Sequence, residues 1–223
     1  MNTWEGLPSV IFGSGANSRE TMHLIEEINN SSNTPVIELV GFVEKNSNCV
    51  GRKVDGYKIV CADNNFEEFA KNFKILGVVI PMGSSTINEL IYNKIRCIPN
   101  IVYPNLIHPN VIFDKKRNKI GKGNIITSGV TITLDIEIGD FNFINRNSTI
   151  GHDVKLGKFN IINPLTSISG NVCIEKNTLI GTGAKILQGI NIEAESIIGA
   201  GAVVTKDVKA GTTVVGVPAR KIK

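Results

Sequence analysis

The strongest constraint on this chain is a hexapeptide repeat in its second half. A branched aliphatic residue recurs at every sixth position without a break, at Ile120, Ile126, Ile132, Ile138, Ile144, Ile150, Leu156, Ile162, Ile168, Ile174, Ile180, Ile186, Ile192, Ile198 and Val204. A helix repeats about every 3.6 residues and an alternating strand about every two, so neither explains a period of six. This period predicts a parallel β-helix, in which each short strand directs one aliphatic side chain inward.

Two other positions of the repeat agree with this prediction. The fourth residue after the aliphatic is mostly small or branched, which suits a narrow interior: Val130, Val154, Thr166, Val172, Thr178, Ala184, Ser196, Ala202 and Val208. The residue directly after the aliphatic is often glycine or asparagine: Gly121, Gly139, Asn145, Gly151, Gly157, Asn163, Gly181 and Gly199. Because glycine and asparagine tolerate backbone angles that other residues resist, we expect these positions to form tight corners.

The first half of the chain follows another pattern, with strands alternating with helices. Residues 9–12 read as an apolar strand that runs into Gly13-Ser14-Gly15, and residues 18–29 have helical spacing with Ser18 as the expected N-cap. Strands are expected at 36–43 and 77–80, and helices at 67–73 and 86–92. This alternation predicts an α/β domain with a parallel sheet over residues 1–108, followed by the β-helix over 109–223.

Composition indicates an ordinary globular protein. Hydrophobic residues make up 42% and charged residues 20% of the chain, and no apolar run approaches the ~20 residues of a membrane span. We see no signal peptide and expect a cytoplasmic protein without membrane insertion. The four cysteines lack metal or disulfide spacing, so we expect structural thiols. A net charge of +4 with 6% aromatics does not indicate a nucleic-acid module.

Three motifs make a family resemblance specific. They are N-x-x-x-x-I-x-H-D at 145–153, I-G-T-G-A at 180–184, and I-G-A-G-A-V-V-T-K-D-V at 198–208 followed by G-V-P-A-R at 216–220. With the N-terminal G-x-G loop, they resemble the hexapeptide-repeat sugar acetyltransferases grouped with sialic acid O-acetyltransferases and UDP-4-amino-sugar N-acetyltransferases. The resemblance implies a left-handed β-helix with three hexapeptides per triangular coil, preceded by a Rossmann-like domain that binds the acceptor.

His152 is the candidate catalytic base. Acetyl transfer from a thioester to an amine or hydroxyl requires removal of a proton from the attacking atom, which histidine can perform near neutral pH. A carboxylate on the other ring nitrogen would fix the tautomer, and Asp153 is the nearest candidate, with the family's acidic residue assigned that role. Asn145 matches a family position that orients the ring or the acceptor. We expect direct attack on acetyl-CoA without an acetyl-enzyme, since no histidine lies near Cys173 in sequence.

The resemblance also implies where the co-substrate acetyl-CoA binds. It places the donor in a groove between neighbouring subunits, near Ile161, Gly181, Thr182, Gly199 and Ala200, where glycines permit close approach. Arg220 or Lys221 is a candidate for the 3′-phosphate. A groove between subunits implies a homotrimer, because the family forms trimers about the helix axis.

The acceptor is expected at the loop after the first strand. G-x-G before a helix presents backbone amides suited to a phosphate, but the last glycine of G-x-G-x-x-G is replaced by Ser18, which argues against a dinucleotide. In the resembling family this loop holds the nucleotide of the sugar, and the matching residues here are Gly13, Gly15, Ala16 and Asn17. Glu44 and Lys45 stand where the family often has two acidic residues, and Gly83 lies after the third strand. Ala16, Asn17 and Lys45 depart from the family pattern, which leaves the acceptor open.

Several alternatives stay open. The leading function is N-acetylation of a UDP-4-amino-4,6-dideoxy sugar, with O-acetylation of a sialic acid as the second. A carbonic anhydrase would need about three histidines around a zinc ion. The chain has only His23, on the expected helix, His108, near the domain boundary, and His152, so we expect no metal. A non-catalytic scaffold would explain the repeat but not the Asn145, His152 and Asp153 set.

Overall fold

The computed structural model describes residues 5–223. Backbone contacts divide the chain into two compact units. One comprises the residues up to Gly83 together with Ile87–Pro109, and the other comprises Ser84–Thr86 together with Asn110–Lys223. None of the helices within residues 5–223 combines the length and apolar character that crossing a membrane requires.

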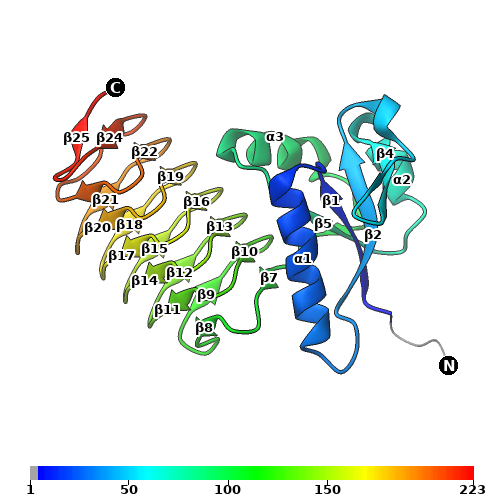
Figure 1. Cartoon of the computed structure of the whole chain (residues 1–223), viewed down its shortest axis with the longest axis horizontal. Coiled ribbons are helices and arrows are strands. Elements are labelled where there is room, and N and C mark those ends of the chain that lie inside the picture. The colour runs from blue at the N-terminus through cyan, green and yellow to red at the C-terminus, as the bar shows by residue number, and fades with distance from the viewer. Residues whose placement is uncertain (1–4) are drawn as a thin grey trace. The chain divides into compact units, whose positions relative to one another are not determined.

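The first unit is built around a six-stranded sheet in the order β3-β4-β2-β1-β5-β6 (Figure 1). Its strands are β1 (Leu7–Phe12), β2 (Ile37–Glu44), β3 (Lys53–Val54), β4 (Tyr57–Ala62), β5 (Leu76–Val79) and β6 (Ile101–Val102). All neighbouring pairs are parallel except β3 with β4. The helices are α1 (Ala16–Asn30), α2 (Phe66–Ala70) and α3 (Ser85–Ile95), and β7 (Leu106–Ile107) follows β6. The expected alternation is therefore present, although β3, β4 and β6 were not predicted.

Helix α1 begins earlier than its sequence suggested. Its N-cap is Gly15 rather than Ser18, and no side chain caps it. Ser18 lies in the first turn, where its buried hydroxyl donates to the carbonyl of Phe12 at 3.1 Å. A serine that bonds to the preceding strand cannot cap its own helix, so the prediction of Ser18 as N-cap was wrong.

The second unit is a stack of coils whose short strands form three sheets, which we call faces 1, 2 and 3, and, with one exception in face 1, neighbouring strands within a face are parallel (Figure 1). Face 1 contains β10 (Ile125–Ile126), β13 (Phe143–Ile144), β16 (Ile161–Ile162), β19 (Leu179–Ile180), β22 (Ile197–Ile198), β24 (Thr213–Val215) and β25 (Arg220–Lys221), and β25 alone of these is antiparallel. Face 2 contains β8 (Ile112–Phe113), β11 (Thr131–Ile132), β14 (Thr149–Ile150), β17 (Ser167–Ile168), β20 (Lys185–Ile186) and β23 (Val203–Val204). Face 3 contains β9 (Lys119–Ile120), β12 (Glu137–Ile138), β15 (Lys155–Leu156), β18 (Cys173–Ile174) and β21 (Asn191–Ile192).

Between Lys119 and Val204, the paired strand residues of successive coils are 18 positions apart, as three hexapeptides per coil require. Ile126 pairs with Ile144, Ile132 with Ile150, and Ile138 with Leu156. The repeated aliphatics are buried except Ile120, in the first coil, which is half-buried. The small or branched residues predicted for the interior are also buried.

The glycines that follow the aliphatics are required for a different reason from the one predicted. The left-handed corner angle occurs two positions later, at residues such as Asp135, Asn147 and Asp153, with φ between 57° and 59°. A Cβ on Gly139 would instead lie 2.6 Å from the carbonyl oxygen of Gly157, and one on Gly181 would lie 2.5 Å from the amide nitrogen of Ala200. These glycines are needed because successive coils approach closely, and the prediction that they supply unusual backbone angles was wrong.

A column of buried asparagines inside the β-helix was not foreseen. Asn142 donates from Nδ2 to Asn124 Oδ1, to the Gly139 carbonyl and to the Gly157 carbonyl, at 3.1, 3.1 and 2.9 Å. Its Oδ1 accepts from the backbone amide of Asn160 at 2.9 Å. These bonds satisfy buried polar groups at the turn between faces 3 and 1, where a purely apolar side chain would leave the Asn160 amide without its partner.

Candidate active site

His152 and Asp153 form a hydrogen-bonded pair at the turn that leads from face 2 to face 3, which we call corner 2/3. The His152 Nδ1 lies 2.8 Å from Asp153 Oδ2, and the two side chains are 56% and 53% exposed. Within residues 5–223, the other ring nitrogen, Nε2, has no hydrogen-bond partner. The pair therefore leaves one ring nitrogen at the surface, able to take a proton from an incoming group.

Asp153 has a second role in the backbone. Its φ is +59°, a left-handed conformation that aspartate and asparagine adopt more readily than other non-glycine residues. Its amide donates to the Leu134 carbonyl of the preceding coil at 3.1 Å. The same residue thus shapes the corner and holds the imidazole, which explains why the aspartate directly follows the histidine.

The residues predicted to bind acetyl-CoA lie at another turn, between face 1 and face 2, which we call corner 1/2. Because Ile144, Ile162, Ile180 and Ile198 are in register, the residues after them form one column, Asn145, Asn163, Gly181 and Gly199. Thr182 and Ala200 are exposed in the adjacent column. Ile161 is buried in this chain, at 3% exposure.

Asn145 therefore shares a corner with the donor residues and not with His152. In the described part of the chain, no hydrogen bond joins Asn145 to His152. Asn163, which the sequence did not single out, continues the same column and donates from Nδ2 to the Ile180 carbonyl at 2.9 Å. Corners 1/2 and 2/3 are the two edges of face 2.

A hollow of about 410 Å³ in the first unit collects most of the residues predicted for the acceptor. Its lining residues are Gly13, Ser14, Gly15, Ala16, Asn17, Ser18, Glu44, Pro81, Met82 and Gly83. Lys45 is exposed and lies outside this lining. The amino end of α1 opens on the hollow without a capping side chain or an acidic residue in its first turn, so its amides favour a negatively charged ligand.

Glu44 is fixed at the edge of the hollow by a residue that the sequence did not identify. One of its carboxylate oxygens, Oε1, accepts from the backbone amide of Ser14 at 2.7 Å and from its hydroxyl at 2.6 Å. The other, Oε2, accepts from the Lys45 amide at 3.2 Å. Gly13 has a φ of +75°, and a Cβ there would lie 2.8 Å from Met82 Cε, so glycine is needed at this position.

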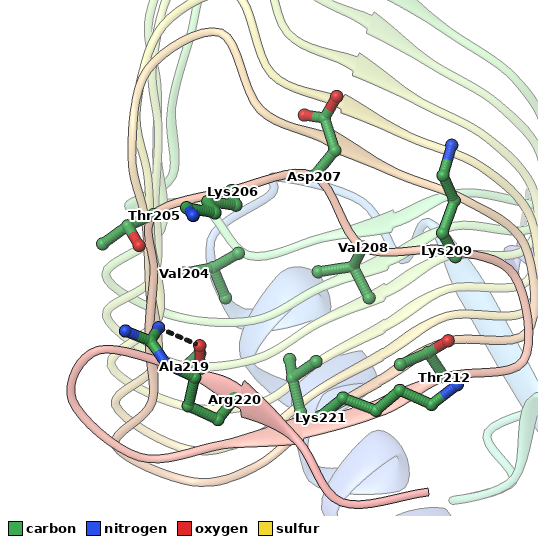
Figure 2. Close-up of a pocket in the computed structure, with 11 residues that line it drawn as sticks. Val204, Thr205, Lys206, Asp207, Val208, Lys209, Thr212, Ala219, Arg220 and Lys221 are labelled. Atoms are coloured by element: carbon green, nitrogen blue, oxygen red, sulfur yellow. Dashed lines mark hydrogen bonds between the residues drawn. The ribbon is translucent and has the colours of Figure 1, made fainter.

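The two cationic residues proposed for a phosphate line a pocket at the last coil of the β-helix. Arg220 and Lys221 line it together with Lys206, Lys209 and Val204 (Figure 2). The Lys209 Nζ is paired with Glu193 at 2.7 Å, and this pair raises the pKa of Lys209 and lowers that of Glu193. The pocket is basic overall, since Asp207 is the only acidic residue in its lining.

The three histidines are distributed over both units of the chain. His23 and His108 belong to the first unit, whereas His152 belongs to the second. Among residues 5–223, no group of three or more His, Cys, Asp or Glu side chains is placed to hold a metal ion.

Sequence comparison finds no matching family model and no matching curated protein. Structure comparison finds solved proteins of the same fold. Perosamine N-acetyltransferase (PerB) from Caulobacter crescentus, solved with CoA and GDP-perosamine, gives a TM-score of 0.86 at 24% identity over 97% of both chains. The acetyltransferase domain of PglB from Neisseria gonorrhoeae, solved with acetyl coenzyme A, gives 0.83 at 22% identity, covering 97% of this chain and 100% of that one.

WeeI from Acinetobacter baumannii gives a TM-score of 0.82 at 27% identity, again covering 97% of this chain and 100% of that one. The chain therefore has, over nearly its whole length, the fold of hexapeptide-repeat sugar acetyltransferases. At the level of the fold, the resemblance drawn from the repeat and its motifs is confirmed.

Proposed function

We propose that the protein is an acetyl-CoA-dependent sugar acetyltransferase, with the 4-amino group of a UDP-4-amino-4,6-dideoxy sugar as its acceptor. The observation that carries this proposal is the His152–Asp153 pair, 2.8 Å apart, with Nε2 of the ring unpartnered at an exposed corner. A histidine that is more than half exposed on the outside of a solenoid does not fill its core, so the ordered pairing of His152 with a carboxylate favours a chemical role.

The reaction we propose is a direct transfer. The amine of the sugar attacks the thioester carbonyl carbon of acetyl-CoA, and His152 Nε2 takes the proton that the nitrogen loses. The carbon–sulfur bond then breaks, and the imidazolium returns the proton to the departing thiolate. Asp153 stabilises the imidazolium and keeps Nδ1 as the ring nitrogen that carries a hydrogen in both states.

We propose that residues 109–223 bind the donor and residues 1–108, as a Rossmann-like domain, bind the acceptor. The hollow at the amino end of α1 suits the phosphates of a nucleotide, and Glu44 suits a hydroxyl of its ribose because a carboxylate accepts hydrogen bonds. Acetyl-CoA would run along corner 1/2 beside Gly181, Thr182, Gly199 and Ala200. Arg220 or Lys221 would meet its 3′-phosphate.

A homotrimer would bring the two corners together. A site that uses His152 at corner 2/3 and the donor residues at corner 1/2 cannot be completed by one narrow prism, because face 2 separates them. In a closed three-fold ring with face 2 towards the axis, corner 2/3 of each chain meets corner 1/2 of the next. Exposed large apolar residues on face 2 and its edges support this packing: Ile112, Leu134, Leu165 and Leu187.

A substrate panel tests the activity. The purified protein is incubated with acetyl-CoA and UDP-linked or GDP-linked 4-amino sugars, or with free and CMP-linked sialic acids, and release of CoA thiol is followed. We expect thiol release with a UDP-4-amino sugar. We also expect His152→Ala to abolish this release while leaving the circular dichroism spectrum unchanged. Transfer to a sialic acid hydroxyl would instead identify an O-acetyltransferase, and no transfer to any acceptor would favour the scaffold.

Mixed trimers test whether two chains build each site. His152→Ala removes the base at corner 2/3, and Ala200→Glu places a charged side chain on the donor path at corner 1/2. In any mixed ring, one junction joins an intact histidine corner to an intact donor corner. Random co-expression of both variants should therefore restore about a quarter of wild-type activity, because about three-quarters of the rings are mixed and each has one of three junctions intact. A site within one chain predicts no restoration.

A further inference from the structure

The His152 ring lies against a glycine of the next coil. Because Ile132, Ile150, Ile168, Ile186 and Val204 are in register, the residues two positions later stack in a column: Leu134, His152, Gly170, Gln188 and Lys206. A Cβ added to Gly170 would lie 2.5 Å from both Cε1 and Nε2 of His152 and 3.0 Å from Cδ2. The space that a side chain at 170 would take is the space the ring occupies.

The fold itself does not require glycine at this position. Gly170 does not have a left-handed φ, so an alanine would meet no backbone strain there. The other members of its column carry side chains, which shows that the β-helix accommodates them at this place in the coil. Gly139 and Gly181 differ, because a Cβ on either would meet backbone atoms of the next coil. At Gly170 the three nearest atoms all belong to the imidazole.

We propose that Gly170 is a positioning residue for the acetyl transfer proposed above, and that its missing side chain forms the seat on which the His152 ring rests. The expected effect on catalysis rests on the proposed function, whereas the contact between the His152 ring and Gly170 does not. With the ring on Gly170, Nδ1 is held at 2.8 Å from Asp153, and Nε2 accepts no hydrogen bond from residues 5–223. The backbone of the seat is fixed, since the Gly170 carbonyl accepts from the Gly189 amide at 3.1 Å and the Asn171 amide donates to the His152 carbonyl at 2.8 Å.

An alanine at 170 would therefore move the base without removing it. Carbon atoms in contact lie about 3.5–4.0 Å apart, so a Cβ at 2.5 Å forces the ring to retreat by about 1 Å or more. The backbone on both sides is bonded, and the ring is more than half exposed, so the ring is the part that moves. It loses its alignment with Asp153 and with any amine bound at the corner.

The kinetic test uses Gly170→Ala, with Gln188→Ala as the control in the same column. A misplacement of about 1 Å predicts a fall in kcat of about 10- to 100-fold for Gly170→Ala, with the KM for acetyl-CoA within about twofold of wild type, because the donor residues lie at another corner. Gln188→Ala should leave both constants within about twofold. An unchanged kcat in Gly170→Ala, or an equal loss in Gln188→Ala, would overturn the proposal.

A structural test separates the seat from the activity. The chain has three histidines, so its Cε1 proton spectrum contains three resonances, and His152→Ala identifies the one from residue 152. Gly170→Ala should shift that resonance and leave the other two unmoved. In the His152→Ala background, Gly170→Ala should raise Tm by about 1–4 °C, as glycine-to-alanine changes do at compatible backbone angles. In the wild-type background this gain should be absent or reversed.

The two sets of results distinguish two failures. If the resonance of His152 stays in place and Gly170→Ala changes Tm equally in both backgrounds, the seat does not exist, whatever the enzyme does. If the resonance moves and the two backgrounds differ, but the wild-type protein transfers no acetyl group to any acceptor, the seat is real and the proposed function is wrong.

Discussion

Replacing Asp153 separates its two roles, because asparagine can keep the corner while losing the carboxylate. Asparagine adopts a φ of +59° about as readily as aspartate, whereas alanine there costs about 1 kcal/mol or more. A hydrogen bond to a charged partner contributes about 1.5–3 kcal/mol, and the lower half of that range applies because both side chains are more than half exposed. At about 1.4 kcal/mol per tenfold change, Asp153→Asn should lower kcat by about 10- to 40-fold.

The stabilities of the two variants should differ. Asp153→Asn should keep Tm within about 1 °C of wild type, and Asp153→Ala should lower it by about 2–4 °C, the shift expected for about 1 kcal/mol in a chain of this size. Thiol release at saturating substrates gives kcat, and thermal denaturation followed by circular dichroism gives Tm. A kcat for Asp153→Asn within twofold of wild type would show that the carboxylate does not assist the histidine. An equal loss of Tm in both variants would refute the role in the corner.

Other parts of the structure lead to four further expectations. Asn142→Ala removes four buried side-chain hydrogen bonds and should lower the free energy of unfolding by about 4 kcal/mol, measured by urea denaturation. Burial raises the pKa of the Cys61 thiol to about 11, so the folded protein should resist alkylation there at pH 8 and lose that protection in urea. Aspartate tolerates the left-handed φ of position 165, so Leu165→Asp should not disturb the corner, but it places a charge at the edge of face 2. Light scattering should therefore detect monomers of 24.1 kDa instead of trimers. Ser14→Ala removes one bond to Glu44 and should raise the KM for the nucleotide sugar several-fold without changing that for acetyl-CoA.

The sequence revealed the interior of the β-helix because the same side-chain environment recurs every six residues. Each aliphatic meets its equivalents one coil above and below, so the requirement for volume and apolarity repeats at Ile144, Ile162 and Ile180. The sequence indicated that positions such as 139 and 181 require glycine, but it did not indicate the cause. A backbone angle is a local property, whereas the approach of the next coil depends on atoms 18 residues away.

The candidate site shows the same division between local and distant contacts. His152 and Asp153 are neighbours in sequence, so their pairing was predictable from the motif. The bond from Ser14 to Glu44 joins residues 30 apart and depends on the parallel register of β1 with β2, in which Phe12 lies beside Val43. No local pattern reveals the role of Gly170 either, since the atoms that its missing side chain would touch belong to His152, 18 residues earlier.

The two edges of face 2, corners 1/2 and 2/3, carry columns of residues that suit different roles in the proposed reaction. At corner 1/2 Gly181 and Gly199 stack in one column and the exposed Thr182 and Ala200 in the next, which suits an extended ligand. At corner 2/3 the column holds one histidine, His152, and the next coil leaves space for its ring at Gly170. A long donor needs many coils, whereas a base needs one position. Under the proposed function, the donor and the base lie on separate edges of the prism and meet only through a neighbouring chain, so assembly and catalysis should be lost together when face 2 is disrupted.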